Sequence, residues 1–251
     1  MALDAAAKRS EDVAVNTTRA VLLVYREVQV KLRTGGWRRR RFHHRASEQE
    51  IEDAVHSFRG LPALVSELTS GAAGMEYRIV EVERALTSLT QETPARFWPS
   101  PHDTRPELSE FAAPGTCDAV FVFWPQRDFA RGSAIPCDAW GLGMGASDWS
   151  NGATYAAVAN APTAAWEGEA RGEVWLHEWL HGVCAHFETH GYRMPERNAD
   201  GAELHGYTRS ATRGWTDYYR DLMTGQVRDG GTMTGIPLVA WRDAAAAGRL
   251  A

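Results

Sequence analysis

One stretch of the sequence combines residues that bind metals with a residue that can move a proton: His177-Glu178-Trp179-Leu180-His181. On a helix with ~100° per residue, His181 lies about 40° from His177, so both imidazoles project from one face. Two such imidazoles can hold one zinc ion (Zn2+), each at ~2.0–2.1 Å. Glu178 lies about 100° round the helix, beside the pair but directed away from the ion. The spacing therefore predicts two zinc ligands and a general base for a zinc-activated water.

The helix that carries this motif has an apolar stripe of its own. Leu176, Leu180, Val183 and Phe187 share one side and would bury the helix against a sheet. We expect the helix to run from about residue 170 to 189. The alternative interpretation is a structural helix whose two histidines only bond to backbone groups.

Three further residues of the helix are not expected to bind the ion. His186 and His190 lie at about 180° and 220° from His177, which is roughly opposite the predicted site. We interpret them as exposed or capping histidines. Cys184 shares the metal-facing side but lies one turn beyond His181, so we do not expect it to be a direct ligand.

The pentapeptide resembles the active-site helix of the zincin metallopeptidases. That resemblance implies His177 and His181 as zinc ligands, Glu178 as catalytic base, and a peptide or small amide as substrate. It also implies a mixed sheet above the helix, whose edge strand aligns the substrate backbone. Metzincins continue the motif with Gly and then His or Asp, where this chain has Cys184 and Phe187, so it departs from that group.

A catalytic zinc usually keeps three protein ligands and one open position. Beyond Gly191, the segment ERNADGAELHGY offers three candidates: Asp200, Glu203 and His205. A loose similarity to aspzincins, which use an Asp followed by a Tyr-Gly element, favours Asp200. His205 would complete a three-histidine site, and Glu203 would suit a gluzincin. Gly201 would let the chain turn sharply after Asp200.

A tyrosine serves several zincin groups by donating a hydrogen bond to the oxyanion. The resemblance makes Tyr207 the expected residue here, with Tyr155, Tyr192 and Tyr218 as alternatives. If none of the three downstream candidates binds zinc, Asp217 is the next carboxylate along the chain.

The elements that must position the motif are predicted from periodicity and turn signals. Ser47 and Glu50 form a capping box that begins a helix ending near residue 58, and a second helix ends near residue 70. Strands are expected over 19–32, 75–86 and 118–124, with 37–45 as the return strand of a hairpin. The other expected elements are a Pro-rich connector over 94–114, a loop and an edge strand within 141–162, and helices over 211–224 and 237–249.

These elements predict an α+β fold with a mixed twisted sheet. Residues 1–18 are expected to be a polar tail, and 19–190 a sheet-containing subdomain that includes the motif helix. Residues 191–251 are expected to form a smaller, mostly helical C-terminal part.

Composition limits the partners and the compartment. The chain has 251 residues and a formal charge of -5, which gives no drive toward nucleic acid. It has no run of ~18 apolar residues for a membrane span and no apolar signal region, so we expect a cytoplasmic protein. The cysteines number three; Cys117 and Cys137 could pair after export, but free thiols are expected.

A basic run over 38–45, with five arginines and two histidines, is the strongest charge cluster. We interpret it as a solvated hairpin edge that charge protects from aggregation. The alternative is a surface for phosphate or an acidic partner.

The favoured function is zinc-dependent hydrolysis of an amide, most plausibly a peptide bond, with Glu178 as base. Two alternatives stay open. One is an enzyme of the same fold that acts on a specialised, non-peptide substrate, for example in a biosynthetic pathway. The other is a non-catalytic metal-binding protein, against which Glu178 beside the metal argues.

Overall fold

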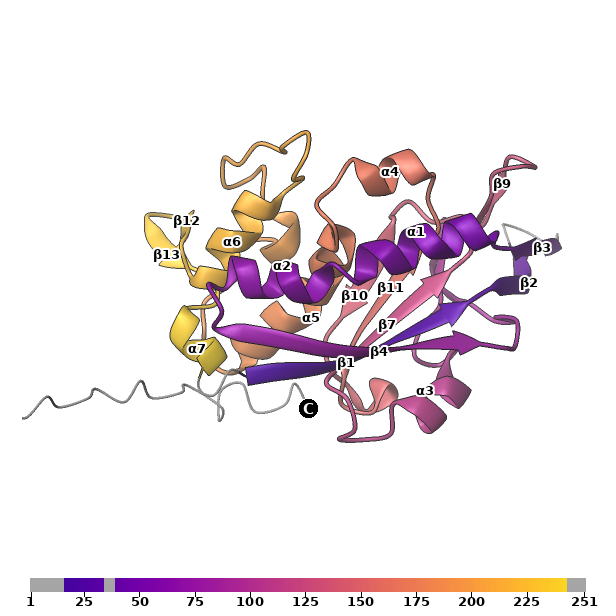
Figure 1. Cartoon of the computed structure of the whole chain (residues 1–251), viewed down its shortest axis with the longest axis horizontal. Coiled ribbons are helices and arrows are strands. Elements are labelled where there is room, and N and C mark those ends of the chain that lie inside the picture. Colours follow the sequence, from indigo (N-terminus) through magenta and orange to yellow (C-terminus); the bar gives the residue numbers. More distant parts are fainter. Residues whose placement is uncertain (1–15, 34–38, 243–251) are drawn as a thin grey trace, which may run out of the picture.

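A computed structural model describes residues 16–33 and 39–242 of the chain. Its centre is a five-stranded mixed sheet with the strand order β10-β11-β7-β1-β4 (Figure 1). Four strands run parallel, and β10 pairs antiparallel to β11 at one edge. The bounds are Asn16–Tyr25 for β1, Ala73–Val82 for β4, Ala119–Trp124 for β7, Gly141–Met144 for β10 and Thr154–Ala159 for β11.

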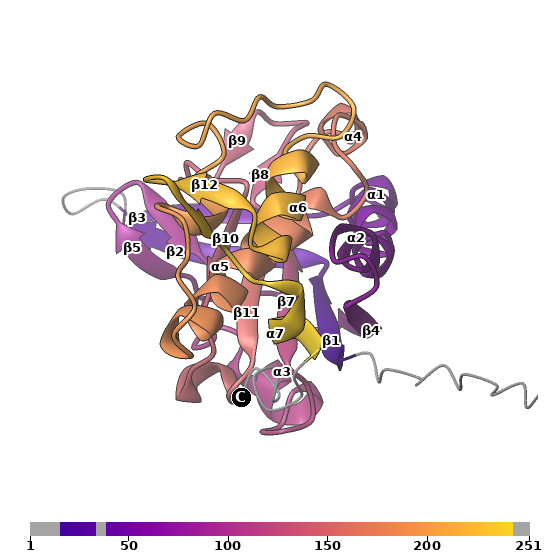
Figure 2. The same ribbon diagram turned by 90° about the vertical axis from the view of Figure 1, so that its left-hand side faces the viewer.

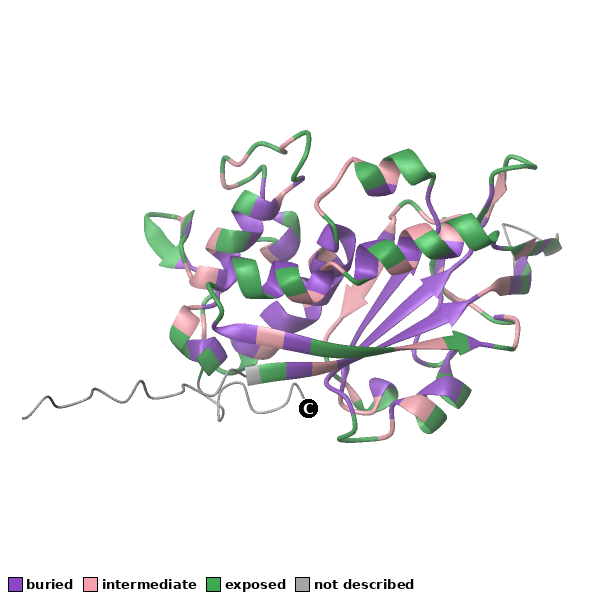
Figure 3. Ribbon diagram, in the orientation of Figure 1, coloured by how far each residue is buried: buried purple, intermediate pink, exposed green. Residues whose placement is uncertain are grey.

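The sheet is buried on both faces because its strands are apolar at successive positions. On β1, Leu22 and Val24 join one cluster of buried residues, and Val21 and Leu23 join another. Side chains alternate between the faces of a strand, so the two clusters lie on opposite faces of the sheet. Figure 3 shows the central strands as almost wholly buried.

Helices cover one face of the sheet, and a helix with two small hairpins contributes to the other. The first group comprises α1 (Glu48–Phe58), α2 (Leu61–Leu68) and α5 (Glu173–Thr189). The second comprises α3 (Arg105–Phe111), the pair β2 (Glu27–Arg33) and β3 (Arg39–Arg45), and the pair β5 (Thr90–Thr93) and β6 (Arg96–Trp98).

The C-terminal segment packs on the helical face and shares its core. Tyr219, Leu222 and Trp241 belong to the same buried cluster as Leu22 of β1. Figure 2 shows this segment next to α5. Its elements are a 3-10 turn η2 (Asn198–Asp200), α6 (Thr216–Thr224), β12 (Val227–Asp229), β13 (Thr232–Thr234) and α7 (Leu238–Arg242).

The remaining short elements are connectors: β8 (Arg127–Asp128), β9 (Ser133–Ala134), a 3-10 turn η1 (Asp148–Ser150) and α4 (Thr163–Glu167). Within the described ranges, no helix combines the length and the apolar character needed to cross a bilayer. Cys117, Cys137 and Cys184 are all unpaired, as expected.

Several predicted elements are confirmed. The α+β class and the mixed sheet are present. The capping box of Ser47 and Glu50 begins α1, because each side chain accepts a hydrogen bond from the other residue's backbone N–H. The predicted hairpin return strand is β3, and the predicted central strand, β7, is buried along its whole length.

Other predictions need correction. The strand expected over 19–32 is two strands, which part at Arg26 and enter different sheets, and β1 begins at Asn16, inside the expected tail. The alternating small residues form β11, an interior strand, whereas the glycine-rich part forms the edge strand β10. The connector over 94–114 contains β6 and α3, and β12 and β13 interrupt the helical C-terminal part. The expected helix over 237–249 is α7 to Arg242, and its remainder lies outside the described residues.

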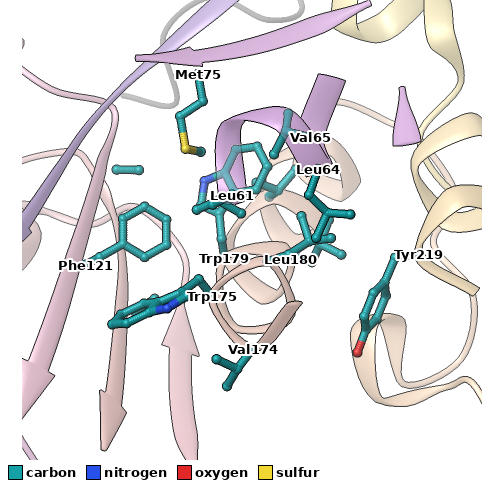
Figure 4. Packing of buried hydrophobic residues seen from close by; sticks show 14 of the residues in the cluster. Leu61, Leu64, Val65, Met75, Phe121, Val174, Trp175, Trp179, Leu180 and Tyr219 are labelled. Carbon is teal, nitrogen blue, oxygen red and sulfur yellow. The ribbon is translucent and has the colours of Figure 1, made fainter. Parts of the chain in front are cut away.

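The stripe predicted for the motif helix is buried as expected. Leu176, Leu180, Val183 and Phe187 of α5 are at most 1 % exposed. Figure 4 shows Trp175 and Leu180 of the same helix among side chains of the sheet and of α2. Burying each such side chain contributes about 1.5–3 kcal/mol, so packing rather than intrinsic propensity holds α5 in place.

Glycines allow α5 to lie directly against the edge strand. A Cβ on Gly143 would overlap the backbone carbonyl oxygen of Glu178, and one on Gly141 would lie 2.5 Å from the Glu178 Cγ. From the helix side, a Cβ on Gly182 would lie 2.7 Å from the Met144 carbonyl oxygen. Only glycine fits at these three positions, so they determine how closely Glu178 approaches β10.

Gly143→Ala should therefore destabilise the protein. Its methyl group meets helix backbone, which cannot move aside alone, so we expect a loss of about 1–3 kcal/mol in the free energy of unfolding. Gly145→Ala is the matched control, because its Cβ would make an ordinary 3.6 Å contact with Ala185. Urea denaturation of both variants measures the difference. Equal stabilities would show that α5 does not depend on this close approach.

Candidate metal centre

The two motif histidines and Glu178 lie together in the structure. One nitrogen of each histidine and a carboxylate oxygen of Glu178 all lie within 4.8 Å of one another. The rings of His177 and His181 are edge to face, with centroids 4.9 Å apart. Both residues are partly buried, and Glu178 is 5 % exposed. The helix thus presents the two histidines together with Glu178 beside them, as its spacing predicts.

Asp200 reaches the same point from η2. One of its carboxylate oxygens lies 3.3 Å from His177 Nε2, and the other lies 3.9 Å from His181 Nε2. Asp200 is exposed at the rim, whereas the histidines are recessed below it. Of the three downstream residues considered as a third ligand, Asp200 is the one that the structure brings to both histidines.

The opposite nitrogen of each histidine has a partner of its own. His181 Nδ1 lies 2.9 Å from the Asn198 Oδ1, and His177 Nδ1 lies 2.8 Å from the Tyr219 hydroxyl. The Asn198 oxygen can only accept, so His181 carries its proton on Nδ1 and leaves Nε2 free to bind a metal. Such outer contacts orient metal-binding histidines and raise their basicity.

A strained turn positions Asn198 and Asp200 beside α5. Arg197 and Asn198 have positive φ values of 63° and 35°, which non-glycine residues rarely adopt. The sharp turn therefore lies before Asp200, not after it as predicted, because Gly201 has an ordinary φ of -81°. Gly201 is needed for space instead, since a Cβ there would lie 2.5 Å from the Glu196 carbonyl oxygen.

The other predicted site residues lie away from the histidines. His205 stacks on Tyr218, and its Nε2 lies 3.1 Å from the Glu196 carbonyl oxygen. Glu203 is exposed, and neither residue lines the cavity above the motif. Tyr207 donates its hydroxyl to Asp221 at 2.5 Å and also lies outside this cavity. The geometry supports neither the alternative ligands nor the oxyanion role expected of Tyr207.

The remaining alternatives also have other contacts. Tyr155 and Tyr218 bond elsewhere, to Thr104 and to the Asn198 carbonyl, and Asp217 pairs with Arg220. Tyr192 packs edge to face against Phe187 and does not line the cavity. Cys184 is fully buried. Of the two histidines expected to face away, His190 is exposed and His186 is partly buried, and neither lines the cavity. The tyrosine that the structure does bring to the motif is Tyr219.

A cavity of about 580 Å³ opens above the motif. Gly141, Leu142 and Gly143 of the edge strand form part of its wall. Arg96 also lines it, but its guanidinium is paired with Asp138 at 2.6 Å. The other charged groups of the wall, apart from the histidines, are carboxylates: Glu92, Glu169, Glu173, Glu178 and Asp200. The cavity is therefore acidic and suited to hold a cation.

Burial and mutual contact shift the pKa values of the motif. Burial raises the pKa of Glu178 to about 7, although the charge of His177 acts in the opposite direction. Burial also opposes protonation of His177, but the hydrogen bond to Asp200 and the charge of Glu178 together raise its pKa above 6.5. Burial and the neighbouring His177 lower the pKa of His181. The contact with His177 lowers the pKa of Asp200.

This donor set fits a zinc ion. Two imidazole nitrogens and a carboxylate oxygen are ligands that zinc prefers, and ligands at ~2.0–2.2 Å in a tetrahedral site lie roughly 3.3–3.6 Å apart. The separations of 3.3 and 3.9 Å between Asp200 and the histidines are close to that range. Within the described residues no hydrogen bond reaches the buried Glu178 carboxylate, so a nearby cation would stabilise its charge.

Sequence reasoning missed four residues that shape this centre: Asn198, Tyr219, Gly141 and Gly143. The two glycines lie in a conspicuous Gly-x-Gly-x-Gly run, which was a usable signal for a close approach of backbone. Asn198 and Tyr219 had no such signal, because their contact with the motif depends on how the chain returns to α5. Comparisons with protein-family models, with curated proteins and with solved structures each found no match for this chain.

Zinc stoichiometry should separate the ligand candidates. His177→Ala and His181→Ala should each abolish one-to-one zinc binding, and Asp200→Ala should weaken it severely, because two ligands make an open, weak site. Glu203→Ala and His205→Ala are the controls and should retain full binding. Metal analysis after dialysis against a weak chelator gives the result. If His205→Ala loses zinc while Asp200→Ala keeps it, His205 is the third ligand.

Zinc affinity should fall as the solution becomes acidic. A proton on Nε2 competes with the metal, so binding is strong above the pKa of His177 and weakens below it. Because contact with Asp200 helps to raise the pKa of His177, the pH below which zinc affinity falls should lie above 6.5. NMR titration of the metal-free protein should show the His177 pKa falling in Asp200→Asn. An unchanged pKa in that variant would contradict the contact.

Proposed function

We propose that this protein is a zinc-dependent hydrolase that cleaves the amide bond of a peptide. The observation that carries the proposal is the placement of the buried Glu178 carboxylate within 4.8 Å of the two histidine nitrogens, with the Asp200 carboxylate 3.3 Å from His177 Nε2 and 3.9 Å from His181 Nε2. A purely structural metal site fills its coordination with protein ligands, whereas this arrangement leaves space above the histidines.

In this proposal His177, His181 and Asp200 hold the metal, and Asn198 and Tyr219 fix the orientation of the two imidazoles. A zinc ion there supplies Lewis-acid chemistry, since it lowers the pKa of water to ≈ 7 and polarises a carbonyl. The resemblance of the motif to zincins points to the same assignment. No further residue is needed to explain the donor set.

Glu178 is the proposed general base. Its burial gives it a pKa of about 7 before a metal binds, so the carboxylate can both accept and return a proton near neutral pH. It would take a proton from the attacking water and deliver it to the nitrogen that leaves. Gly141 and Gly143 keep this carboxylate against the edge strand, because a larger residue would displace it.

The edge strand β10 suits an extended peptide as substrate. The Trp140 carbonyl accepts a hydrogen bond from the Ala159 N–H, so even-numbered residues of β10 pair toward β11. In an antiparallel ladder the residues between them direct their N–H and C=O groups away. Gly141 and Gly143 therefore offer backbone groups to a further strand, next to the cavity that they line.

Glu178→Gln should retain zinc and fold but lower kcat at least ~10²-fold, the lower end for general acid–base catalysis. Glu178→Asp should fail as well, because its shorter side chain retracts from the water. The assay follows cleavage of quenched fluorescent peptides of mixed sequence by zinc-loaded protein, with Glu203→Gln as a control carboxylate away from the site.

Two outcomes separate the alternatives. Near-native turnover in Glu178→Gln would leave the motif as a metal-binding helix without a catalytic base. Stoichiometric zinc without cleavage of any peptide would favour the specialised amide substrate or the non-catalytic metal site.

A further inference from the structure

The basic hairpin, formed by β2 and β3, has one apolar and one cationic face. Val28, Val30 and Phe42 are buried in the cluster on the second face of the sheet. The opposite side carries Lys31 and Arg41, which are both exposed. A hairpin held by its apolar face thus presents cations to solvent on the other.

The strand register sets like charges against each other. Lys31 lies directly opposite Arg41, and Gln29 lies opposite His43. Like charges at opposed positions destabilise a strand pair. At the base of the hairpin, Glu27 pairs with His43 at 2.9 Å and Arg45 at 3.2 Å. Over the described residues, no carboxylate pairs with Lys31 or Arg41, so their repulsion is left for an external anion to relieve.

A cavity lies beside these two cations. Its volume is about 520 Å³, and Lys31, Arg41, His43, Gln29 and Thr87 are among its lining residues. Two full positive charges with an amide and a hydroxyl are the groups that bind carboxylates or phosphates. A solvated edge that only resists aggregation would not require a hollow lined in this way.

The basic hairpin and the metal cavity are joined by one short segment. Leu86 accepts a hydrogen bond from the Gln29 N–H at 2.9 Å and donates one to the Glu27 carbonyl at 2.8 Å. From there the chain passes Thr87, in the basic cavity, and reaches Glu92, in the metal cavity. Five residues span at most roughly 18 Å, so an extended peptide of about six residues can reach from one cavity to the other.

We propose that the basic hairpin is an exosite: Lys31 and Arg41 dock an acidic segment of the polypeptide whose amide bond is cleaved at the metal centre. This inference rests on the proposed function. The carboxylates around the metal would repel such a segment, so it is held at a distance from the bond that is cut. A nucleic acid is disfavoured because the chain as a whole carries a formal charge of -5, which gives no general attraction to a phosphate backbone.

Binding of a fluorescein-labelled decaglutamate peptide to the zinc-loaded Glu178→Gln protein tests the exosite without any cleavage. Lys31→Glu/Arg41→Glu should weaken binding at least ~10-fold, because opposite charges steer and hold the peptide. The matched control, Arg59→Glu/Arg228→Glu, makes the same change in charge at two exposed arginines away from the hairpin, and should alter affinity less than ~2-fold. Fluorescence anisotropy at low and moderate salt gives both values.

Two results would overturn the exosite. One is equal binding of decaglutamate to the wild type and the Lys31→Glu/Arg41→Glu variant, or no binding to either. The other is decathymidylate bound as tightly as decaglutamate and lost in the same variant, which would assign the hairpin to phosphate backbones.

Cleavage kinetics tests the link to the metal centre. A fluorescent peptide that the wild type cuts is extended by six glutamates, placed about six residues from the cleaved bond. The extension should lower KM at least ~3-fold in the wild type and not in Lys31→Glu/Arg41→Glu, with kcat unchanged. An equal KM change in both proteins would refute the link. If no peptide is cut, the proposed function fails, while the decaglutamate measurement still decides the exosite.

Discussion

The direct contact between α5 and the edge strand β10 is the constraint on which the rest of the centre depends. Gly141 and Gly143 on the strand, and Gly182 on the helix, remove the side chains that would hold the two backbones apart. Glu178 consequently lies in the angle between helix and strand, buried and without a hydrogen bond among the described residues. The proposed catalytic base and the strand edge proposed to align a substrate thus come from a single packing contact.

Residues before and within η2, and one residue of α6, complete the centre around that contact. The turn at Arg197 and Asn198 adopts backbone angles that non-glycine residues rarely hold. It places the Asn198 side-chain oxygen next to one histidine and the Asp200 carboxylate next to both. Tyr219 comes from α6 to support the other histidine. Because η2 and α6 share the core cluster with α5, their packing against it holds these polar contacts in place.

Charge is distributed unevenly over the molecule. Carboxylates line the metal cavity, whereas the basic hairpin presents Lys31 and Arg41, which pair with no carboxylate of the described residues. The segment from Leu86 to Glu92 runs between the two cavities. Local fields of this kind matter more for recognition than the small net charge of the chain, because charges separated by more than about 8–10 Å are screened in physiological salt. The two cavities therefore differ in the charge that they present.

The sequence alone determined the motif helix, since the four-residue spacing of His177 and His181 and the stripe from Leu176 to Phe187 are local properties of one helix. It also determined the fold class and the buried strand β7, because apolar periodicity and turn residues act over short ranges. Only the tertiary structure decided which downstream residue meets the histidines, and that Tyr219 rather than Tyr207 contacts His177. These contacts join residues 23 and 42 positions apart, and their geometry follows from loop conformation and packing, which periodicity does not encode.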